Sequence, residues 1–201
     1  MPPISRGFHG RRRDDADPAR IPPGQYLTPD FPVLSAGPTP HTPLDEWSLT
    51  IHGAVDEAVS WTWDELRALP AERFTVDIHC VTKWSKLDTS WEGVSLDTLL
   101  AGVDTSASFA LVASYGGYTT NLPLADLRGG TAWVAHRFEG ADLEPKHGGP
   151  ARLLVPHLYL WKSAKWVRGF SLHAEDQAGF WETLGYHMYG DPWREQRYWG
   201  D

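Results

Sequence analysis

The segment Phe74-Thr-Val-Asp-Ile-His-Cys80-Val-Thr-Lys-Trp84 contains the only cysteine in the 201-residue chain. Apolar residues alternate with polar ones from Phe74 to Cys80, which is the pattern of a strand with one buried face. The segment therefore predicts a strand that ends with the Cys80 thiol on its apolar side. Free cysteines are often buried and usually behave as small hydrophobic groups. This segment alone favours a structural role for the thiol.

The composition excludes several kinds of site. A single cysteine cannot form an internal disulfide, a CxxC redox pair, a CxxCH haem attachment or a four-cysteine cluster. Any redox chemistry would therefore need a cofactor held mostly without sulfur. The formal charge of -8 argues against non-specific binding of nucleic acid, which requires a basic surface. No run of 18 apolar residues and no apolar export signal occur, so we expect no membrane-spanning segment and a cytoplasmic protein.

Local signals predict one domain over residues 21–201, behind a flexible lead at 1–20 that is charged and poor in apolar residues. Thr62-Trp-Asp-Glu65 has the spacing of a capping box and predicts a short helix that ends at Leu69. A second short helix is expected between Ser95 and Gly102.

The remaining pattern consists of short apolar and alternating runs separated by glycine. We expect a turn at 91–93, a polar and partly exposed segment at 159–166, and an aromatic tail after residue 175 that packs over the core. Many short strands with few short helices indicate an α+β domain dominated by β structure. The expected strands are 47–52, 74–80, 131–138, 151–156 and 167–173, with a hairpin over 109–120.

A basic stretch interrupts this acidic chain. From Lys146 to Arg168 there are five Lys and Arg residues and no Asp or Glu. Two glycines precede Arg152, and the segment 162–165 adds two lysines, a serine and an alanine. Turned backbone amides, cations and small residues together are typical of a phosphate-binding site. The alternative is a basic patch that is balanced by acids from elsewhere in the fold, such as Asp142.

Several segments together resemble the molybdopterin-dependent oxidoreductases of the sulfite oxidase family. They are especially similar to its small bacterial members, which include the catalytic subunit of the methionine sulfoxide reductase system. Their order and spacing extend over about residues 21 to 175, and the resemblance implies a β-dominated, mixed α+β molybdopterin-binding domain of the sulfite oxidase type. The matching segments are Phe31–Pro38, His79–Trp84, Trp91–Leu96, Tyr118–Leu124, His147–Pro156 and Lys162–Trp166.

The resemblance implies a molybdenum-molybdopterin cofactor (Mo-MPT), with Cys80 as the one protein ligand to the metal. Molybdenum bound by dithiolene sulfurs favours another soft thiolate, and we expect a neighbouring cation to keep the thiol deprotonated. His79 is not expected as a second ligand, because adjacent strand residues point to opposite faces. Tyr118 is a hypothetical donor in the substrate pocket. The implied cofactor contacts are Leu34, Ser35, Ser114, Tyr115, His147, Arg152, Lys162, Ser163, Ala164 and Lys165.

These residues predict a molybdenum enzyme that performs two-electron oxidation or oxygen-atom transfer on a small, sulfite-like or sulfoxide-like substrate. Electrons would pass to or from an external partner, because the chain has no haem motif or iron–sulfur ligands. Two alternatives stay open. One is a non-catalytic β-rich binding module that uses its tryptophans as a stacking platform. The other is a metal-free cysteine nucleophile, with His79 or His136 as its base.

Overall fold

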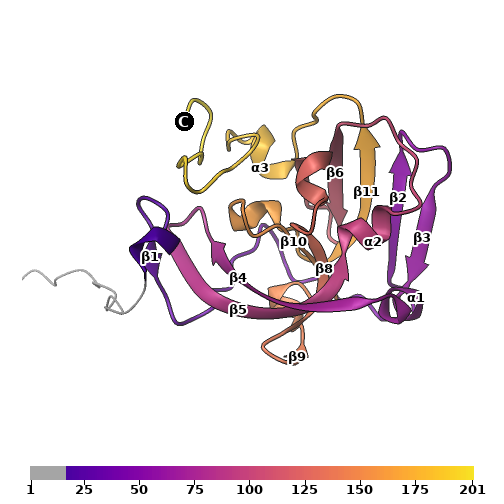
Figure 1. Cartoon of the computed structure of the whole chain (residues 1–201), viewed down its shortest axis with the longest axis horizontal. Coiled ribbons are helices and arrows are strands. Elements are labelled where there is room, and N and C mark those ends of the chain that lie inside the picture. Colours follow the sequence, from indigo (N-terminus) through magenta and orange to yellow (C-terminus); the bar gives the residue numbers. More distant parts are fainter. Residues whose placement is uncertain (1–16) are drawn as a thin grey trace, which may run out of the picture.

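Two β-sheets form the framework of the computed structural model, which describes residues 17–201 (Figure 1). The first sheet has the order β1-β5-β8-β10, with β4 added to β5 and β9 to β8. Its strands are β1 (Tyr26–Leu27), β4 (Ala71–His79), β5 (Trp84–Ser95), β8 (Trp133–Phe138), β9 (Ala141–Asp142) and β10 (Arg152–Leu154). The second sheet has the order β3-β2-β11-β6-β7. Its strands are β2 (Ser48–Gly53), β3 (Val59–Thr62), β6 (Phe109–Ser114), β7 (Thr119–Pro123) and β11 (Val167–His173).

The helices between these strands are short. The α-helices are α1 (Trp63–Ala68), α2 (Leu96–Leu100) and α3 (Phe180–Thr183). The 3-10 helices are η1 (Pro18–Arg20), η2 (Leu124–Leu127), η3 (Pro145–His147) and η4 (Leu160–Lys162). The predicted capping box is confirmed, because the side chains of Thr62 and Glu65 each accept a hydrogen bond from the other residue's backbone N–H. The β-dominated α+β fold predicted from the sequence is also confirmed.

The long hairpin of β4 and β5 carries Cys80 at its tip. In Figure 1 these two strands run side by side along the lower part of the molecule, with β9 below them. Cys80 follows the last residue of β4, and its backbone N–H donates to the carbonyl oxygen of Trp84 at 2.9 Å. The predicted alternation places Ile78 and Cys80 together in a buried cluster that also contains Trp84 and Trp91. The thiol therefore sits in a tight turn whose inner side is apolar.

The turn predicted at 91–93 is wrong, because β5 continues through it to Ser95. Both Trp91 and Gly93 pair with β8 in the sheet. A Cβ atom on Gly93 would lie 2.5 Å from the carbonyl oxygen of Val134 and 2.7 Å from Cα of Ala135. Gly93 therefore permits the close approach of β8, and β5 does not end at this glycine.

The segment 159–166 was expected to be partly exposed, and it is largely buried instead. Tyr159 and Lys162 are both 0% exposed. Lys162 can be buried because its ammonium group forms an ion pair with Glu182, which is equally buried, at 2.6 Å. The prediction failed because this carboxylate lies 20 residues further along the chain.

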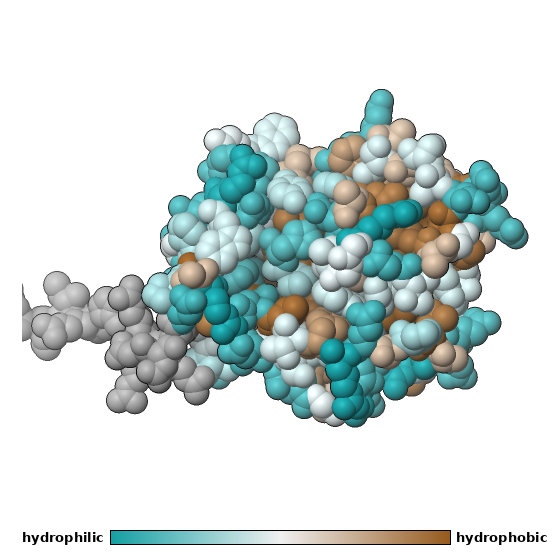
Figure 2. Space-filling view, viewed as in Figure 1, coloured by the Kyte–Doolittle hydropathy of each residue, from teal (hydrophilic) through white to brown (hydrophobic). Residues whose placement is uncertain are grey.

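The predicted lead at 1–20 falls mostly outside the described residues. At the start of the described chain, Arg20 forms ion pairs of 2.6 Å with Asp77 and with Asp88. None of the described helices has the length and apolar character needed to cross a membrane. On the face shown in Figure 2, hydrophilic residues cover most of the surface and hydrophobic ones show between them. The domain boundary near residue 21 stays a prediction.

We expect Gly93→Ala to destabilise the protein by about 1–3 kcal/mol, because the new methyl group must displace the backbone of β8. Gly102→Ala is the matched control, since a Cβ atom there meets nothing within 4 Å. The free energy of unfolding in urea would measure both effects. Equal changes in the two variants would contradict this explanation of Gly93.

Candidate active site

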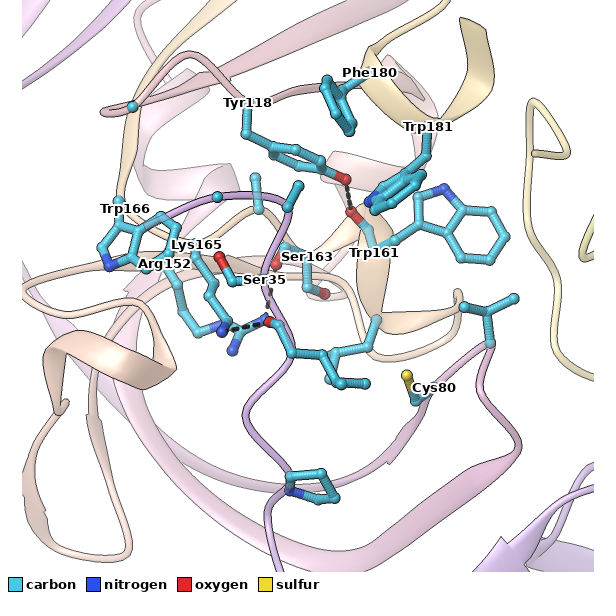
Figure 3. Close-up of a pocket in the computed structure, with 18 of the residues that line it drawn as sticks. Ser35, Cys80, Tyr118, Arg152, Trp161, Ser163, Lys165, Trp166, Phe180 and Trp181 are labelled. Atoms are coloured by element: carbon cyan, nitrogen blue, oxygen red, sulfur yellow. Dashed lines mark hydrogen bonds between the residues drawn. The ribbon is translucent and has the colours of Figure 1, made fainter. Parts of the chain in front are cut away.

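A cavity of about 460 Å³ brings together segments that are distant in the sequence (Figure 3). Its walls come from residues 31–40, the turn that holds Cys80, the β6–β7 turn, the stretch 152–166 and the start of the C-terminal segment. Nine of the sequence-predicted site residues line this cavity. They are Leu34, Ser35, Cys80, Tyr115, Tyr118, Arg152, Ser163, Ala164 and Lys165.

The Cys80 thiol is 7% exposed and faces the cavity from the hairpin tip. Its Sγ atom accepts a hydrogen bond from Thr82 Oγ1 at 3.1 Å. Burial raises the pKa of the thiol, and this outweighs the lowering by Thr82 and by the charge of Lys165. The expectation that a cation keeps the free thiol deprotonated is therefore wrong. A bound metal ion removes the proton of a coordinating thiol directly.

Arg152 and Lys165 form a basic end of the cavity, on the side away from Cys80 in Figure 3. The buried guanidinium of Arg152 donates to the carbonyl oxygens of His147 at 2.8 Å and Ser163 at 2.7 Å. Lys165 Nζ donates to the carbonyl oxygen of Leu34 at 2.7 Å. Burial lowers the pKa of Arg152 to about 10, so the guanidinium keeps its charge at neutral pH. Burial, aided by the charge of Arg152, lowers the pKa of Lys165 to about 8.

His147 and Ser114 do not line the cavity, but each has a buried polar atom that forms no hydrogen bond. The ring of His147 stacks on Phe31, a lining residue, with centroids 4.1 Å apart. Burial lowers the pKa of His147 to about 4, so the imidazole is neutral at pH 7. Buried polar atoms in folded proteins nearly always have partners. A soft sulfur ligand and two cations that line the cavity, with two unpaired polar groups beside its wall, fit a metal-bearing, phosphorylated cofactor.

Lys162 is the third predicted contact that lies outside the cavity lining. Its Nζ atom donates to the side chains of Glu182 and Asn121, at 2.6 and 2.7 Å. It also donates to two backbone carbonyls, those of Asn121 and Met188. An ammonium group has three protons, so these four acceptors occupy it fully. The structure thus places Lys162 where it holds the C-terminal segment.

The end of the cavity opposite the basic residues is aromatic. Tyr118 donates its hydroxyl proton to the carbonyl oxygen of Trp161 at 2.6 Å, and its ring lies 5.9 Å from that of Phe180. Burial raises the pKa of Tyr118 well above its usual value, so the hydroxyl stays protonated. The sequence reasoning did not single out the lining residues Thr82, Trp161, Phe180, Trp181 and Tyr186. The dense run of aromatic residues near the C-terminus was the available signal for the last three.

The geometry gives no support to a histidine-assisted nucleophile. His79 Nδ1 lies 2.8 Å from Ser85 Oγ, and His136 contacts Arg67. Burial lowers the pKa of both histidines to about 4. Among the described residues no three His, Cys, Asp or Glu side chains are grouped as metal ligands.

A known structure has a similar overall fold. The chain is similar to the sulfane dehydrogenase SoxCD from Paracoccus pantotrophus, with a TM-score of 0.62 and 21% identity, over 69% of this chain and 41% of that chain. Residues 36–181 match the family described as "Oxidoreductase molybdopterin binding domain". The chain belongs to this family and is a molybdopterin-dependent oxidoreductase of the sulfite oxidase type. It is therefore an enzyme, and the interpretation as a non-catalytic binding module is wrong.

Among its relatives is the "Uncharacterized oxidoreductase YuiH" of Bacillus subtilis, which is 42% identical over 95% of this chain and 98% of its own length. A "Putative protein-methionine-sulfoxide reductase subunit YedZ1" of Azospira oryzae is 28% identical over 71% of this chain and 55% of its own. A nitrate reductase of Volvox carteri is 27% identical over 76% of this chain. The match covers 22% of that nitrate reductase.

We expect Lys162→Met to destabilise the protein by about 3–5 kcal/mol, because it leaves the Glu182 carboxylate buried without a counter-charge. The double variant Lys162→Met/Glu182→Leu should recover part of this loss, since no unpaired charge remains. Urea unfolding of the single and double variants would test this. A single variant as stable as the natural protein would show that the pair is not needed.

Proposed function

We propose that this enzyme transfers an oxygen atom, or two electrons, at a molybdenum centre that is held by Cys80. The observation that carries the proposal is the arrangement of one cavity, with a sheltered thiol in one wall and two cations, the buried Arg152 and the partly exposed Lys165, at the other end. The bound molybdenum cofactor supplies the two-electron chemistry, and the protein supplies its position and electrostatic surroundings. Soft thiolate ligation suits molybdenum that already carries dithiolene sulfurs.

Around the cofactor, the chain's own residues have distinct roles in this proposal. Arg152 and Lys165 neutralise the terminal phosphate of the pterin, and the backbone from Ser163 to Lys165 borders it. The unpaired groups of His147 and Ser114 provide hydrogen bonds to the cofactor. Leu34, Ser35, Tyr115 and Ala164 contribute the remaining contacts. Lys162 lies outside the cavity lining and stabilises it indirectly, because its charge is paired with that of Glu182.

At the metal end, Thr82 donates its hydroxyl proton to the Cys80 sulfur. Such a hydrogen bond withdraws charge from a thiolate and adjusts the potential of a metal that it binds. Tyr118 also lines the cavity, but its hydroxyl proton is already donated to the carbonyl oxygen of Trp161. We propose a sulfite-like or sulfoxide-like small substrate and an external electron partner. The cytoplasmic location stays a prediction.

Protein made in a host that synthesises molybdopterin should contain close to one molybdenum atom per chain, and Cys80→Ser should lose most of it. The reason is that serine replaces a soft ligand with a hard one. Elemental analysis of the purified proteins measures the metal, with urea unfolding as the check that the variant is folded. Folded natural protein that contains no molybdenum would disprove the proposal.

Retention of the cofactor should weaken as pH rises above about 8, which is the pKa of Lys165. The phosphate is fully ionised by then, and it favours the charged form of Lys165, so each pH unit above 8 costs affinity by up to about tenfold. Fluorescence of pterin released on dialysis at pH 7 and pH 9.5 would measure this. Lys165→Arg, which stays charged, should flatten the dependence, and an unchanged slope would contradict the role given to Lys165.

A further inference from the structure

The C-terminal segment 179–190 contributes a wall of the cavity, although the family match ends at residue 181. Phe180, Trp181 and Tyr186 of this segment line the cavity, and Figure 3 shows Phe180 and Trp181 above Cys80. Figure 1 shows the segment lying over the region between the two sheets. Of these three side chains, Phe180 and Trp181 lie at the end of the matched domain and Tyr186 lies beyond it.

Buried polar contacts fix this segment to the domain. Glu182 is 0% exposed and accepts from Lys162 Nζ at 2.6 Å, Trp161 Nε1 at 2.9 Å and Thr120 Oγ1 at 2.9 Å. A Cβ atom on Gly179 would lie 2.5 Å from Cα of Thr120, so the segment and β7 are in direct backbone contact. Three donors from two different parts of the fold thus converge on one oxygen of Glu182.

The anchored side chains form a continuous aromatic surface with residues of the domain. The ring of Tyr186 lies 5.2 Å from Trp161 and 5.0 Å from Trp181, and Phe180 lies 5.1 Å from Trp181. Such edge and tilted contacts are favourable for aromatic groups and hold each ring in place. The surface borders the same cavity as the Cys80 thiol.

The charged side chains that line the cavity lie at its basic end. Arg152 and Lys165 are the charged side chains among its described lining residues. Both are engaged by backbone carbonyls at the basic end, where the proposed function assigns them to the phosphate. No lining cation then remains for a small inorganic anion at the metal. Neutral apolar groups, in contrast, gain free energy by leaving water for an aromatic surface.

We propose that Phe180, Trp181 and Tyr186 form the substrate-recognition wall, and that it selects an uncharged substrate with an apolar, ring-sized group next to its reacting oxygen. This inference rests on the proposed function and names the substrate class of the same site. Glu182 and Lys162 are positioning residues, because they fix the wall without lining the cavity. Burial raises the pKa of Tyr186, so its hydroxyl stays protonated and is suited to donate to a substrate oxygen.

Three unreactive probes separate charge from size: methyl phenyl sulfone, the equally large anion benzenesulfonate, and the small neutral dimethyl sulfone. Titration calorimetry on molybdenum-loaded protein should find methyl phenyl sulfone bound at least about tenfold more tightly than either of the others. Trp181→Ala should remove most of this preference, because it deletes the ring on which the phenyl group packs. Trp199→Ala is the matched control, since Trp199 is 73% exposed and does not line the cavity, and it should bind like the natural protein.

Glu182→Gln tests positioning, and it should weaken the phenyl probe several-fold while the small probe binds as before. If this variant does not fold, Trp181→Ala decides alone. Tighter binding of benzenesulfonate, or equal behaviour of Trp181→Ala and Trp199→Ala, would overturn the inference. Molybdenum measured in the same samples separates the two proposals: loaded protein without the preference refutes only the wall, whereas folded protein without the metal refutes both.

Discussion

The buried guanidinium of Arg152 is the interaction on which the arrangement of the site depends. It joins the ends of the 3-10 helices η3 and η4, with one hydrogen bond to the carbonyl oxygen of His147 and another to that of Ser163. The last carbonyl groups of a helix have no partner within it, so a charged donor between the two helix ends stabilises both. The same charge also faces the cavity. Structural support and anion binding therefore converge on one side chain, and the basic end exists before any ligand arrives.

Much of the fold was predictable because its signals are local. The alternation that ends at Cys80 specifies a strand and its buried face, and the spacing from Thr62 to Glu65 specifies a helix start. The turn predicted at Gly93 was wrong because β8, the strand that requires this glycine, lies some 40 residues away in the sequence. In a sequence, a glycine needed for the close approach of two strands cannot be told from a glycine needed for a turn. The exposure predicted for the polar stretch around Lys162 was wrong for a similar reason, because Glu182, which pairs with this lysine, lies in the C-terminal segment.

The residues of the candidate site were predictable where they belong to short motifs that occur in a characteristic order along the sequence. Cys80, Arg152 and the segment from Ser163 to Lys165 line one cavity, and their roles at a cofactor stay predictions. The protonation of Cys80 could not be read from sequence, because burial and a nearby cation act in opposite directions and only coordinates give their balance. The aromatic wall was missed for a different reason. Its residues carry no reactive group, and only the three-dimensional structure places them beside the thiol.

The attachment of the C-terminal segment through Glu182 has a consequence for how such enzymes can diversify. The domain and its C-terminal segment meet at a small, defined junction, in which Lys162, Thr120 and Trp161 all bind one carboxylate. A tail of different sequence that keeps a carboxylate at this point would replace the aromatic side chains and leave the turn that holds Cys80 unchanged. Substrate selectivity would then be exchangeable together with the C-terminal segment. Chimeras of related chains that are joined near Gly179 would have the substrate preference of the protein that donates this segment.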